Sequence, residues 1–597
     1  MSMSVSRIEQ AARLENLGMN VRSRITSGQM VRPVERRELV ERVVGLLAAG
    51  SSVLLRGEPG VGKTELARSL ALAAWPVPKR ALGQLQLIDM NAERSAPPLI
   101  ETAAARFVEG CYYAHELENK MRLSLDAVAG RRGVLFVDNI EECLGLGASS
   151  NDPHTDVATL LMPHLDAGLR VVGTTTPEGE ARMRSRNERF YRHFVVVDVC
   201  EPSAEESQAI ARVHLDAVRA AGTRVSDDAV EAGMLLASRF LPGAIPVEAL
   251  LRLARRAAAA RGAVDPRSLH EAVAAELGID ERFVRGTPPS FAELEAQLTE
   301  SVFGQPEATR EVADALLRFA TGLAPARRPI ATLLFAGPSG CGKTTLALAA
   351  ARAFTGSEDA LVRCDMSEYA DPYAAPRLIG DDEASLVSRL RARPSGVLLL
   401  DEIEKAHASV IRLLLPALGE ARLTSQRGHT ARLDNYLVIA TSNVGITRWI
   451  RGHSRERIVT GVLSDAAQEF PPEFRGRLTR TVVFRPIGQD TTARIVEREL
   501  EQLADLPGLT TRGLQLLWTD TLVEALCDHQ ASLQTGARSL QTVVRGLVAS
   551  PLARWLAENP SAGTGIVTLA PRVVQGRIES LTVDWFDESA CAPGPLH

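Results

Sequence analysis

Long hydrophobic runs are absent from this 597-residue sequence, and no apolar stretch approaches the roughly eighteen residues that a membrane-spanning helix requires. No secretory signal is recognisable. The seven cysteines are scattered and include no Cys-x-x-Cys pair, which argues against a zinc site or a disulfide framework and fits a reducing compartment. We therefore expect a cytoplasmic protein that does not insert into membranes.

A net positive charge is also lacking. The formal net charge is −5, so no general basic field exists to attract nucleic-acid phosphates. Local arginine clusters such as Arg252, Arg255 and Arg256 are typical of solvated helix faces. With 45% hydrophobic residues, the chain can bury a large core, and its length predicts three or four domains.

A phosphate-binding loop lies in the second half of the chain, at 337–344. It reads Gly-Pro-Ser-Gly-Cys-Gly-Lys-Thr, follows an apolar strand pattern and precedes an Ala/Leu-rich helical pattern over 345–354. The glycines let backbone N–H groups surround phosphates, and the lysine reaches the terminal phosphates. These roles fall on Gly337, Gly340, Gly342 and Lys343, and the Thr344 hydroxyl is a ligand for Mg²⁺.

The acidic partner of this loop is the strand pattern 397–400, which ends in Asp401-Glu402. Asp401 is expected to hold the metal shell, and Glu402 to orient and deprotonate the attacking water. Loop and acidic strand in this order predict a complete site for ATP and Mg²⁺.

The same pair of motifs occurs earlier in the chain. Lys63, in the loop 57–64, precedes Lys343 by 280 positions, so the sequence contains a large internal duplication. The residues expected to bind ATP and Mg²⁺ in this first module are Gly57, Gly60, Gly62, Lys63, Thr64 and Asp138.

The first module differs at the general base, because the position equivalent to Glu402 is Asn139. An amide cannot take a proton from water, so a rate factor of about 10²–10⁴ is expected to be lost. Glu141 or Glu142 could replace the base, although both lie beyond the end of the strand. We expect the first site to bind ATP without efficient turnover.

With both modules in view, the chain resembles the Clp family of AAA+ unfoldases and disaggregases, which form two-ring hexamers. Over about residues 34–580 the motifs occur in the family's order. The resemblance implies a sensor in the strand 171–176, at Thr175, and an arginine finger at Arg192, where His193 replaces the family's usual second arginine. An arginine finger completes the site of a neighbouring subunit, so a homo-hexameric ring is implied.

In the second module the resemblance implies a polar sensor at Asn443, a finger at Arg477 and a second sensor at Arg538, within Gly-Ala-Arg-Ser-Leu. These groups would stabilise the charge that develops on the transferred phosphoryl oxygens.

Substrate contacts are implied at two loops. Tyr113 matches the tyrosine of the first-ring pore loop, and Tyr112 replaces the basic residue before it. The alternative is a pair that packs on the surface of its own module. The second-ring loop is shortened and lacks an aromatic residue, so Asp381, Asp382 and Glu383 would form an acidic collar that cannot grip apolar segments.

We predict an α/β fold of two tandem P-loop AAA+ modules, each a parallel-sheet core followed by a mainly helical lid, the last lid carrying a small β element. The short extension at the start is either a docking helix or a disordered lead. The expected boundaries are a short extension 1–34, a first core 35–202, a first lid and linker 203–295, a second core 296–489, a second lid 490–587 and a tail 588–597.

The leading functional hypothesis is ATP-dependent remodelling of a protein substrate or dedicated client. Hydrolysis would occur mainly in the second module, while the first binds ATP and presents the tyrosines. No folded N-terminal or coiled-coil middle domain is expected, and the segment 460–462 does not resemble a Clp-peptidase docking loop. One alternative is a nucleotide-switched scaffold that threads nothing. A DNA-directed AAA+ protein is disfavoured by the acidic charge, so no nucleic-acid partner is expected.

Overall fold

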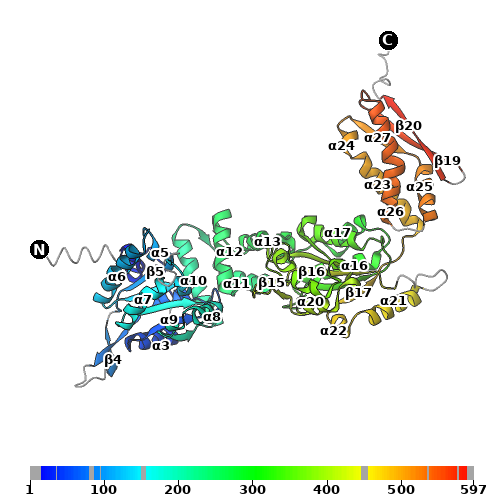
Figure 1. Ribbon diagram of the computed structural model, residues 1–597. Coiled ribbons are helices and arrows are strands. Elements are labelled where there is room, and N and C mark those ends of the chain that lie inside the picture. The colour runs from blue at the N-terminus through cyan, green and yellow to red at the C-terminus, as the bar shows by residue number, and fades with distance from the viewer. Residues whose placement is uncertain are drawn as a thin grey trace, which may run out of the picture. The chain divides into compact units, whose positions relative to one another are not determined.

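The structure is a computed structural model that describes residues 15–34, 36–79, 87–94, 96–148, 156–445, 455–533, 537–574 and 577–587. At some positions near the ends of these ranges, Arg538 among them, only the backbone is described. The chain divides into two compact units, Met1–Ala272 and Val273–His597, each built around its own parallel sheet (Figure 1).

The first unit contains a six-stranded sheet in the order β1-β5-β6-β7-β2-β8. All neighbouring strands are parallel except β1 and β5, which are antiparallel. Four of the five residues of β2 and of β6 are buried, as expected for central parallel strands. The strands are β1 (Met19–Asn20), β2 (Ser52–Arg56), β5 (Leu99–Ala103), β6 (Val134–Asp138), β7 (Arg170–Thr175) and β8 (Phe194–Asp198), and β3 (Trp75–Lys79) pairs separately with β4 (Leu87–Arg94).

Helices flank this sheet and bury one apolar side each. Leu125 of α6 and Leu161 of α7, for example, are fully buried in the hydrophobic core of this unit. The helical segments of this core are α2 (Val21–Thr26), α3 (Arg37–Ala48), α4 (Lys63–Ser69), α5 (Ala104–Val108), α6 (Ala114–Gly130), the 3₁₀ turn η1 (Ile140–Cys143), α7 (Val157–Asp166), α8 (Pro177–Arg186) and α9 (Glu188–Tyr191).

The expected extension 1–34 is in part integral to the first core. Residues 19–20 add β1 to the sheet, and the Thr102 hydroxyl donates to the carbonyl of Leu17 at 2.6 Å. Leu17 and Val21 are buried. A segment of this length cannot bury a core of its own. Its described part instead completes the core of the module that follows. Residues 1–14 of the expected docking helix or disordered lead lie outside the described residues.

The first lid follows the core, as predicted. Apolar residues at three- and four-residue spacing predict helices over 205–220, 227–238 and 246–261. The structure has three helices within two residues of these bounds, namely α10 (Ala204–Ala220), α11 (Ala229–Phe240) and α12 (Pro246–Arg261). A short parallel pair, β9 (Arg224–Val225) and β10 (Ala263–Val264), joins the ends of the helical segments.

The second unit contains a five-stranded parallel sheet in the order β12-β13-β16-β11-β17, which is the order of the parallel strands in the first unit. Every residue of β11, β13 and β16 is buried. The strands are β11 (Ala331–Ala336), β12 (Leu361–Asp365), β13 (Gly396–Asp401), β16 (Tyr436–Ser442) and β17 (Arg480–Val483), and β14 (Arg422–Thr424) with β15 (Thr430–Arg432) forms a separate hairpin.

The helical segments of the second core include α16 (Pro306–Ala320) and α17 (Lys343–Thr355), which pack beside the sheet. The others are η2 (Glu358–Ala360), η3 (Met366–Tyr369), η4 (Pro372–Ala374), α18 (Ala375–Leu378), α19 (Leu386–Arg391), η5 (Ile403–Lys405), α20 (Ala408–Glu420), α21 (Arg455–Glu469) and α22 (Pro472–Arg475).

The expected linker up to residue 295 belongs partly to the second unit. The division falls inside α13 (Pro266–Leu277), and α14 (Glu281–Arg285) and α15 (Phe291–Ser301) pack on the second core. The Ser395 hydroxyl donates to the carbonyl of Leu277 at 2.5 Å, and Phe283 contacts Phe354 edge to face at 5.4 Å. Local sequence pattern does not reveal such long-range contacts.

The last lid has the small β element that the sequence predicts. Its three strands have the order β18-β19-β20, with β18 and β19 parallel and β19 and β20 antiparallel. The elements are α23 (Gln489–Ala504), α24 (Pro507–Thr510), β18 (Leu514–Trp518), α25 (Asp520–Leu533), α26 (Ala537–Val544), the π-helical turn η7 (Arg545–Ala549), α27 (Ser550–Glu558), β19 (Gly565–Val574) and β20 (Arg577–Asp587). The expected tail 588–597 lies outside the described residues.

Candidate nucleotide sites

The phosphate loop of the second unit joins β11 to α17, as its sequence predicts. Gly342 has φ +99°, a conformation that favours glycine, and α17 starts at the next residue. The Lys343 ammonium donates to the carbonyls of Gly337 at 2.6 Å and Pro338 at 2.9 Å. Burial lowers the pKa of Lys343 from its ordinary value, and nearby carboxylates oppose that shift. Lys343 is therefore held inside the loop, where a phosphate would bind.

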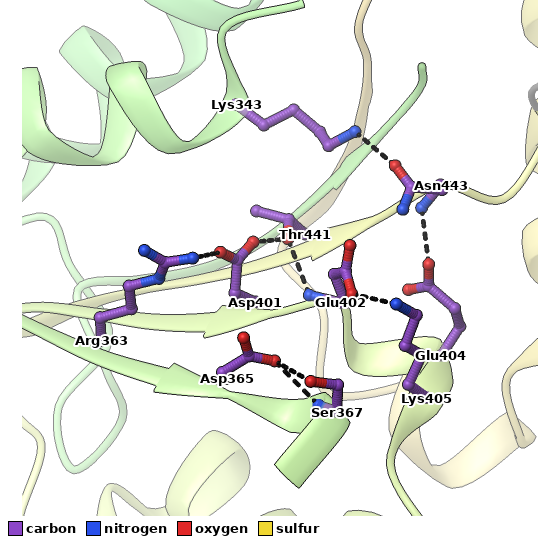
Figure 2. Close-up of polar contacts among 10 residues, drawn as sticks. All are labelled: Lys343, Arg363, Asp365, Ser367, Asp401, Glu402, Glu404, Lys405, Thr441 and Asn443. Atoms are coloured by element: carbon purple, nitrogen blue, oxygen red, sulfur yellow. Dashed lines mark hydrogen bonds and ion pairs between the residues drawn. The ribbon is translucent and has the colours of Figure 1, made fainter. Parts of the chain in front are cut away.

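The acidic strand β13 ends beside this loop (Figure 2). Asp401 is 6% exposed, and one of its oxygens accepts from the Thr441 hydroxyl at 2.5 Å. The other accepts from the Arg363 guanidinium at 2.7 Å. Thr441 also accepts the backbone N–H of Glu402 at 3.0 Å. Thr441 thus fixes the two acidic residues relative to each other from the neighbouring strand β16.

Glu402 begins a 3₁₀ turn with φ +56°, a strained backbone conformation for a residue other than glycine. Its carboxylate forms an ion pair with Lys405 (Figure 2). Two residues later, Glu404 accepts the backbone N–H of Asn443 at 3.0 Å, and the Asn443 side chain accepts from Lys343 at 3.1 Å. The candidate sensor and the loop lysine are therefore joined in one polar chain that ends at Glu404, while the candidate base Glu402 is held separately by Thr441 and Lys405.

These groups line a cleft of about 200 Å³. Thr344 and Asp401 both line this cleft. Their hydroxyl and carboxylate oxygens, together with phosphate oxygens of a nucleotide, are ligands that Mg²⁺ prefers. In the described part of the chain, no group of three or more His, Cys, Asp or Glu residues could hold a metal by itself. The residues present therefore fit Mg²⁺ that is bound jointly by protein and nucleotide.

The two remaining predicted arginines of the second unit are not among the residues that line this cleft. Arg477 is exposed and lies against α20, where a Cβ added to Gly419 would come within 2.4 Å of its guanidinium. A residue that acts on a neighbouring subunit must be exposed in this way. Arg538 lies in the first turn of α26, but its side chain is outside the described residues.

The first site repeats most of this geometry. Lys63 donates to the carbonyls of Gly57 at 2.7 Å and Glu58 at 2.8 Å, and burial lowers its pKa. The Thr64 hydroxyl donates to Asp138 at 3.1 Å. Asp138 also accepts from the Thr174 hydroxyl at 2.5 Å. Thr174 in turn accepts the backbone N–H of Asn139 at 2.9 Å, and these two bonds match those of Thr441 in the second site.

Asn139 occupies the position of Glu402 in backbone as well as in sequence, with φ +49°. Of the two possible replacements for the base, Glu142 is exposed, whereas Glu141 is 7% exposed and one of its oxygens has no hydrogen-bond partner. Glu141 corresponds to Glu404, which in the second site contacts the sensor backbone and coexists with the base. This correspondence favours a structural role for Glu141, like that of Glu404, over a role as the general base.

The predicted sensor Thr175 is one residue out of register. Strand pairing aligns Arg56 with Thr175 in the first sheet and Ala336 with Ser442 in the second, so Asn443 corresponds to Thr176. Thr175 is fully buried, and its hydroxyl donates to the carbonyl of Thr176 at 3.3 Å. Three consecutive threonines hide the register in the sequence, whereas the strand pairing and the Thr174–Asp138 hydrogen bond both reveal it.

The finger segment of the first unit presents one arginine. Arg192 is 73% exposed in its side chain and pairs with Glu188 at 2.8 Å. His193 is turned inward, with Nε2 3.0 Å from an Asp166 oxygen and Nδ1 2.9 Å from the carbonyl of Arg189. The histidine therefore does not replace the second exposed cation of the family pattern.

The two tyrosines project from the surface before α6. Tyr112 is 90% exposed and Tyr113 is 66% exposed, so neither ring is buried against its own module, although Tyr113 stacks on His115 at 5.8 Å. Their backbone N–H groups both donate to the Glu116 carboxylate, at 2.8 and 3.1 Å, and these bonds lower the pKa of Glu116. The loop that carries the tyrosines is thus anchored at its base.

The expected acidic collar of the second unit is only partly free. Asp381 accepts from the Ser425 hydroxyl at 2.6 Å and lies 3.1 Å from His429 Nδ1, on the β14–β15 hairpin. These bonds lower the pKa of Asp381. Asp382 and Glu383 are exposed. Because Asp381 is bonded to Ser425 and His429, it is not a free charge. We call this contact the clasp, since it joins the loop at Asp381 to a hairpin more than forty residues later in the sequence.

Comparisons with known proteins agree with this geometry. Residues 53–196 match the model of the ATPase family associated with various cellular activities (AAA), residues 328–481 match an AAA domain (Cdc48 subfamily), and residues 487–569 match the C-terminal D2-small domain of ClpB protein. No helix in the described part of the chain is long and apolar enough to cross a membrane.

Similar proteins extend over most of the chain. A ClpA homolog protein from Fuscovulum blasticum is 30% identical over 90% of this chain and 69% of its own length. The ClpE subunit of a Clp protease from Lactococcus lactis is 27% identical over 92% of this chain and 81% of its own length. The chaperone protein ClpB from Corynebacterium diphtheriae is 27% identical, over 92% and 78%.

Solved structures of Hsp104 have the same fold. The closed state of Hsp104 with ATPγS and FITC casein gives a TM-score of 0.79 at 26% identity, covering 96% of this chain and 99% of that chain. The Saccharomyces cerevisiae Hsp104–casein complex in its extended conformation gives 0.78 at 25% identity, covering 96% and 100%. With two AAA modules in this order and a ClpB-type final lid, the chain belongs to the Clp family of AAA+ ATPases, enzymes that bind and hydrolyse ATP.

Proposed function

We propose that this protein is a ring-forming, ATP-dependent remodeller of protein substrates in which the second module supplies the hydrolysis and the first supplies a nucleotide-clamped grip. A single observation carries the division. After each acidic strand, a threonine of the neighbouring strand accepts the backbone N–H of the residue that follows the aspartate, an arrangement that we call the threonine clamp. That residue has positive φ in both sites, but it is Glu402 in the second site and Asn139 in the first.

In the second site, Lys343 would hold the β- and γ-phosphates, with Thr344 and Asp401 holding Mg²⁺, which neutralises charge on the transferred phosphoryl group. Glu402 would orient and deprotonate water once its ion pair with Lys405 opens. Asn443 already contacts Lys343 and is placed to sense the γ-phosphate. In the first site the corresponding residues bind nucleotide, but Asn139 cannot act as a base.

The exposed Tyr112 and Tyr113 are the proposed contact to an extended polypeptide. Tyrosine offers a large amphipathic surface with few rotatable bonds, so little entropy is lost on binding. Arg192 and Arg477 are the proposed fingers, which requires a ring, and a homo-hexamer is the assembly that the family resemblance implies. Hsp104 structures bound to casein support a protein substrate by analogy. No Clp-peptidase partner is proposed.

The test is steady-state ATP hydrolysis of the wild type, Glu402→Gln and Lys63→Ala, with native mass measured on the same samples. We expect Glu402→Gln to remove at least about 99% of turnover, at the lower end of the general-base range. We expect Lys63→Ala to loosen the ring mainly. The matched control is Glu420→Gln, an exposed carboxylate on α20. Substantial turnover in Glu402→Gln would mean that the first module is a motor itself.

A nucleotide-switched scaffold that threads nothing is the second candidate. It is favoured by the clasped Asp381 and by the lack of an aromatic residue in the loop that carries it. Remodelling of a partner that survives Tyr112→Ala/Tyr113→Ala would support this scaffold and exclude threading.

A further inference from the structure

A second, smaller pocket adjoins the phosphate cleft of the second unit. Its volume is about 80 Å³, and Gly342, Thr345 and Gln541 line both hollows. A nucleotide whose phosphates occupy the loop can therefore extend its nucleoside toward this pocket.

One part of the pocket wall is apolar. It includes Val302, Phe303, Ile487 and Ile495, and such a surface suits the faces of a purine. The Arg498 guanidinium donates to the carbonyl of Ser301 at 2.6 Å, which fixes the segment that carries Val302.

The rest of the wall is polar and includes Arg498, Glu499 and Gln541. Glu499 on α23 is only 7% exposed, and its carboxylate accepts from the amide of Gln541 on α26 at 2.7 Å. A buried carboxylate is costly unless hydrogen-bond donors surround it, so the free lone pairs of Glu499 favour a ligand with hydroxyl donors. Gln541, which lines both hollows, marks the junction between phosphate and base, where the sugar must lie.

We propose that Glu499, held by Gln541, recognises the ribose hydroxyls of the bound nucleotide and so makes the second site selective for ribonucleotides over deoxyribonucleotides. A vicinal diol presents two O–H donors, which a carboxylate accepts well. Because α23 and α26 both belong to the last lid, the same contact ties that lid to the nucleotide. The inference depends on nucleotide binding and not on the proposed division of labour or on threading.

The test measures binding of ADP, 2′-deoxy-ADP, 3′-deoxy-ADP and inosine diphosphate by calorimetry, which avoids turnover. All proteins carry Lys63→Ala, so that only the second site is titrated. The parent should bind ADP at least tenfold more tightly than one of the deoxy analogues, because a site built around a hydroxyl is left unpaired without it. Glu499→Gln should reduce this ratio below threefold and leave the ratio of ADP to inosine diphosphate unchanged.

The control is Glu501→Gln, an exposed carboxylate on the same helix, which should keep the parent's ratios. A deoxy penalty that persists in Glu499→Gln overturns the proposal. So does a loss of discrimination against inosine diphosphate instead, which would mean that the carboxylate contacts the base. If Glu499→Gln fails to fold, Gln541→Ala is compared in the same ratios, and an unchanged deoxy penalty there overturns the proposal equally.

Discussion

Replacing Thr441 by valine tests the clamp at the second site. The exchange preserves shape and β-propensity in β16 but removes the hydroxyl that donates to Asp401 at 2.5 Å and accepts from Glu402 N–H at 3.0 Å. In Thr441→Val, the buried Asp401 keeps its contact with Arg363 but loses the hydroxyl donor. The Glu402 N–H loses its acceptor.

A hydrogen bond to a charged group contributes about 1.5–3 kcal/mol. If that energy is expressed in the transition state, the rate falls by about 10- to 100-fold, since about 1.4 kcal/mol corresponds to a factor of ten. The loss should appear in kcat, because the phosphate loop that binds nucleotide is untouched. Thr441→Ser, which keeps the hydroxyl, should restore most of the turnover.

The assay is steady-state ATP hydrolysis over a range of ATP concentrations, with ADP affinity measured in parallel. Thr481→Val on β17 controls for a threonine-to-valine exchange in the same sheet. Thr174→Val removes the equivalent bond at the first site and should lower turnover less than threefold if Asn139 has silenced that site. Equal losses in Thr174→Val and Thr441→Val, or a change in KM alone for Thr441→Val, would refute the reasoning.

Three further outcomes are expected. Ala421→Gly should raise the unfolding free energy of the second unit by about 0.5–1 kcal/mol in thermal melts, because Ala421 has φ +51°, whereas Ala417→Gly in the helix interior should lower it. Iodoacetamide at pH 8 should label exposed Cys200 well before Cys341, whose buried thiol has a raised pKa. Peptide mass mapping measures the two labelling rates, and equal rates would contradict the prediction. Tyr112→Ala/Tyr113→Ala should abolish remodelling of a model client while ATP hydrolysis without client persists, as a coupled fluorescence assay would measure.

Most of the sheet and loop architecture was predictable from local pattern. The central strands carry continuous apolar residues, and each phosphate loop carries its glycines at fixed spacing, so neighbouring residues alone identify them. The same holds for the helices of the first lid, whose three- and four-residue apolar spacing predicted their bounds within two residues.

Features that depend on partners far along the chain were not predictable. Asp381 is paired with Ser425 and His429, and Glu499 with Gln541, and no local signal links such positions. The sensor was misplaced for a different reason. Thr174, Thr175 and Thr176 are chemically alike, so only strand register separates the residue that binds Asp138 from the residue that corresponds to Asn443.

The clasp at Asp381 also bears on how such a machine would move its client. The clasp fastens the shortened loop to the β14–β15 hairpin, so the loop cannot follow a moving chain independently. Under the proposed function, traction would come from Tyr112 and Tyr113 alone, and the client would slip backward whenever that single row of tyrosines released it. Low processivity follows. Such a motor suits a weakly held tail or one subunit of an assembly, which a few short pulls can dislodge, better than a stable domain that must be unravelled from end to end.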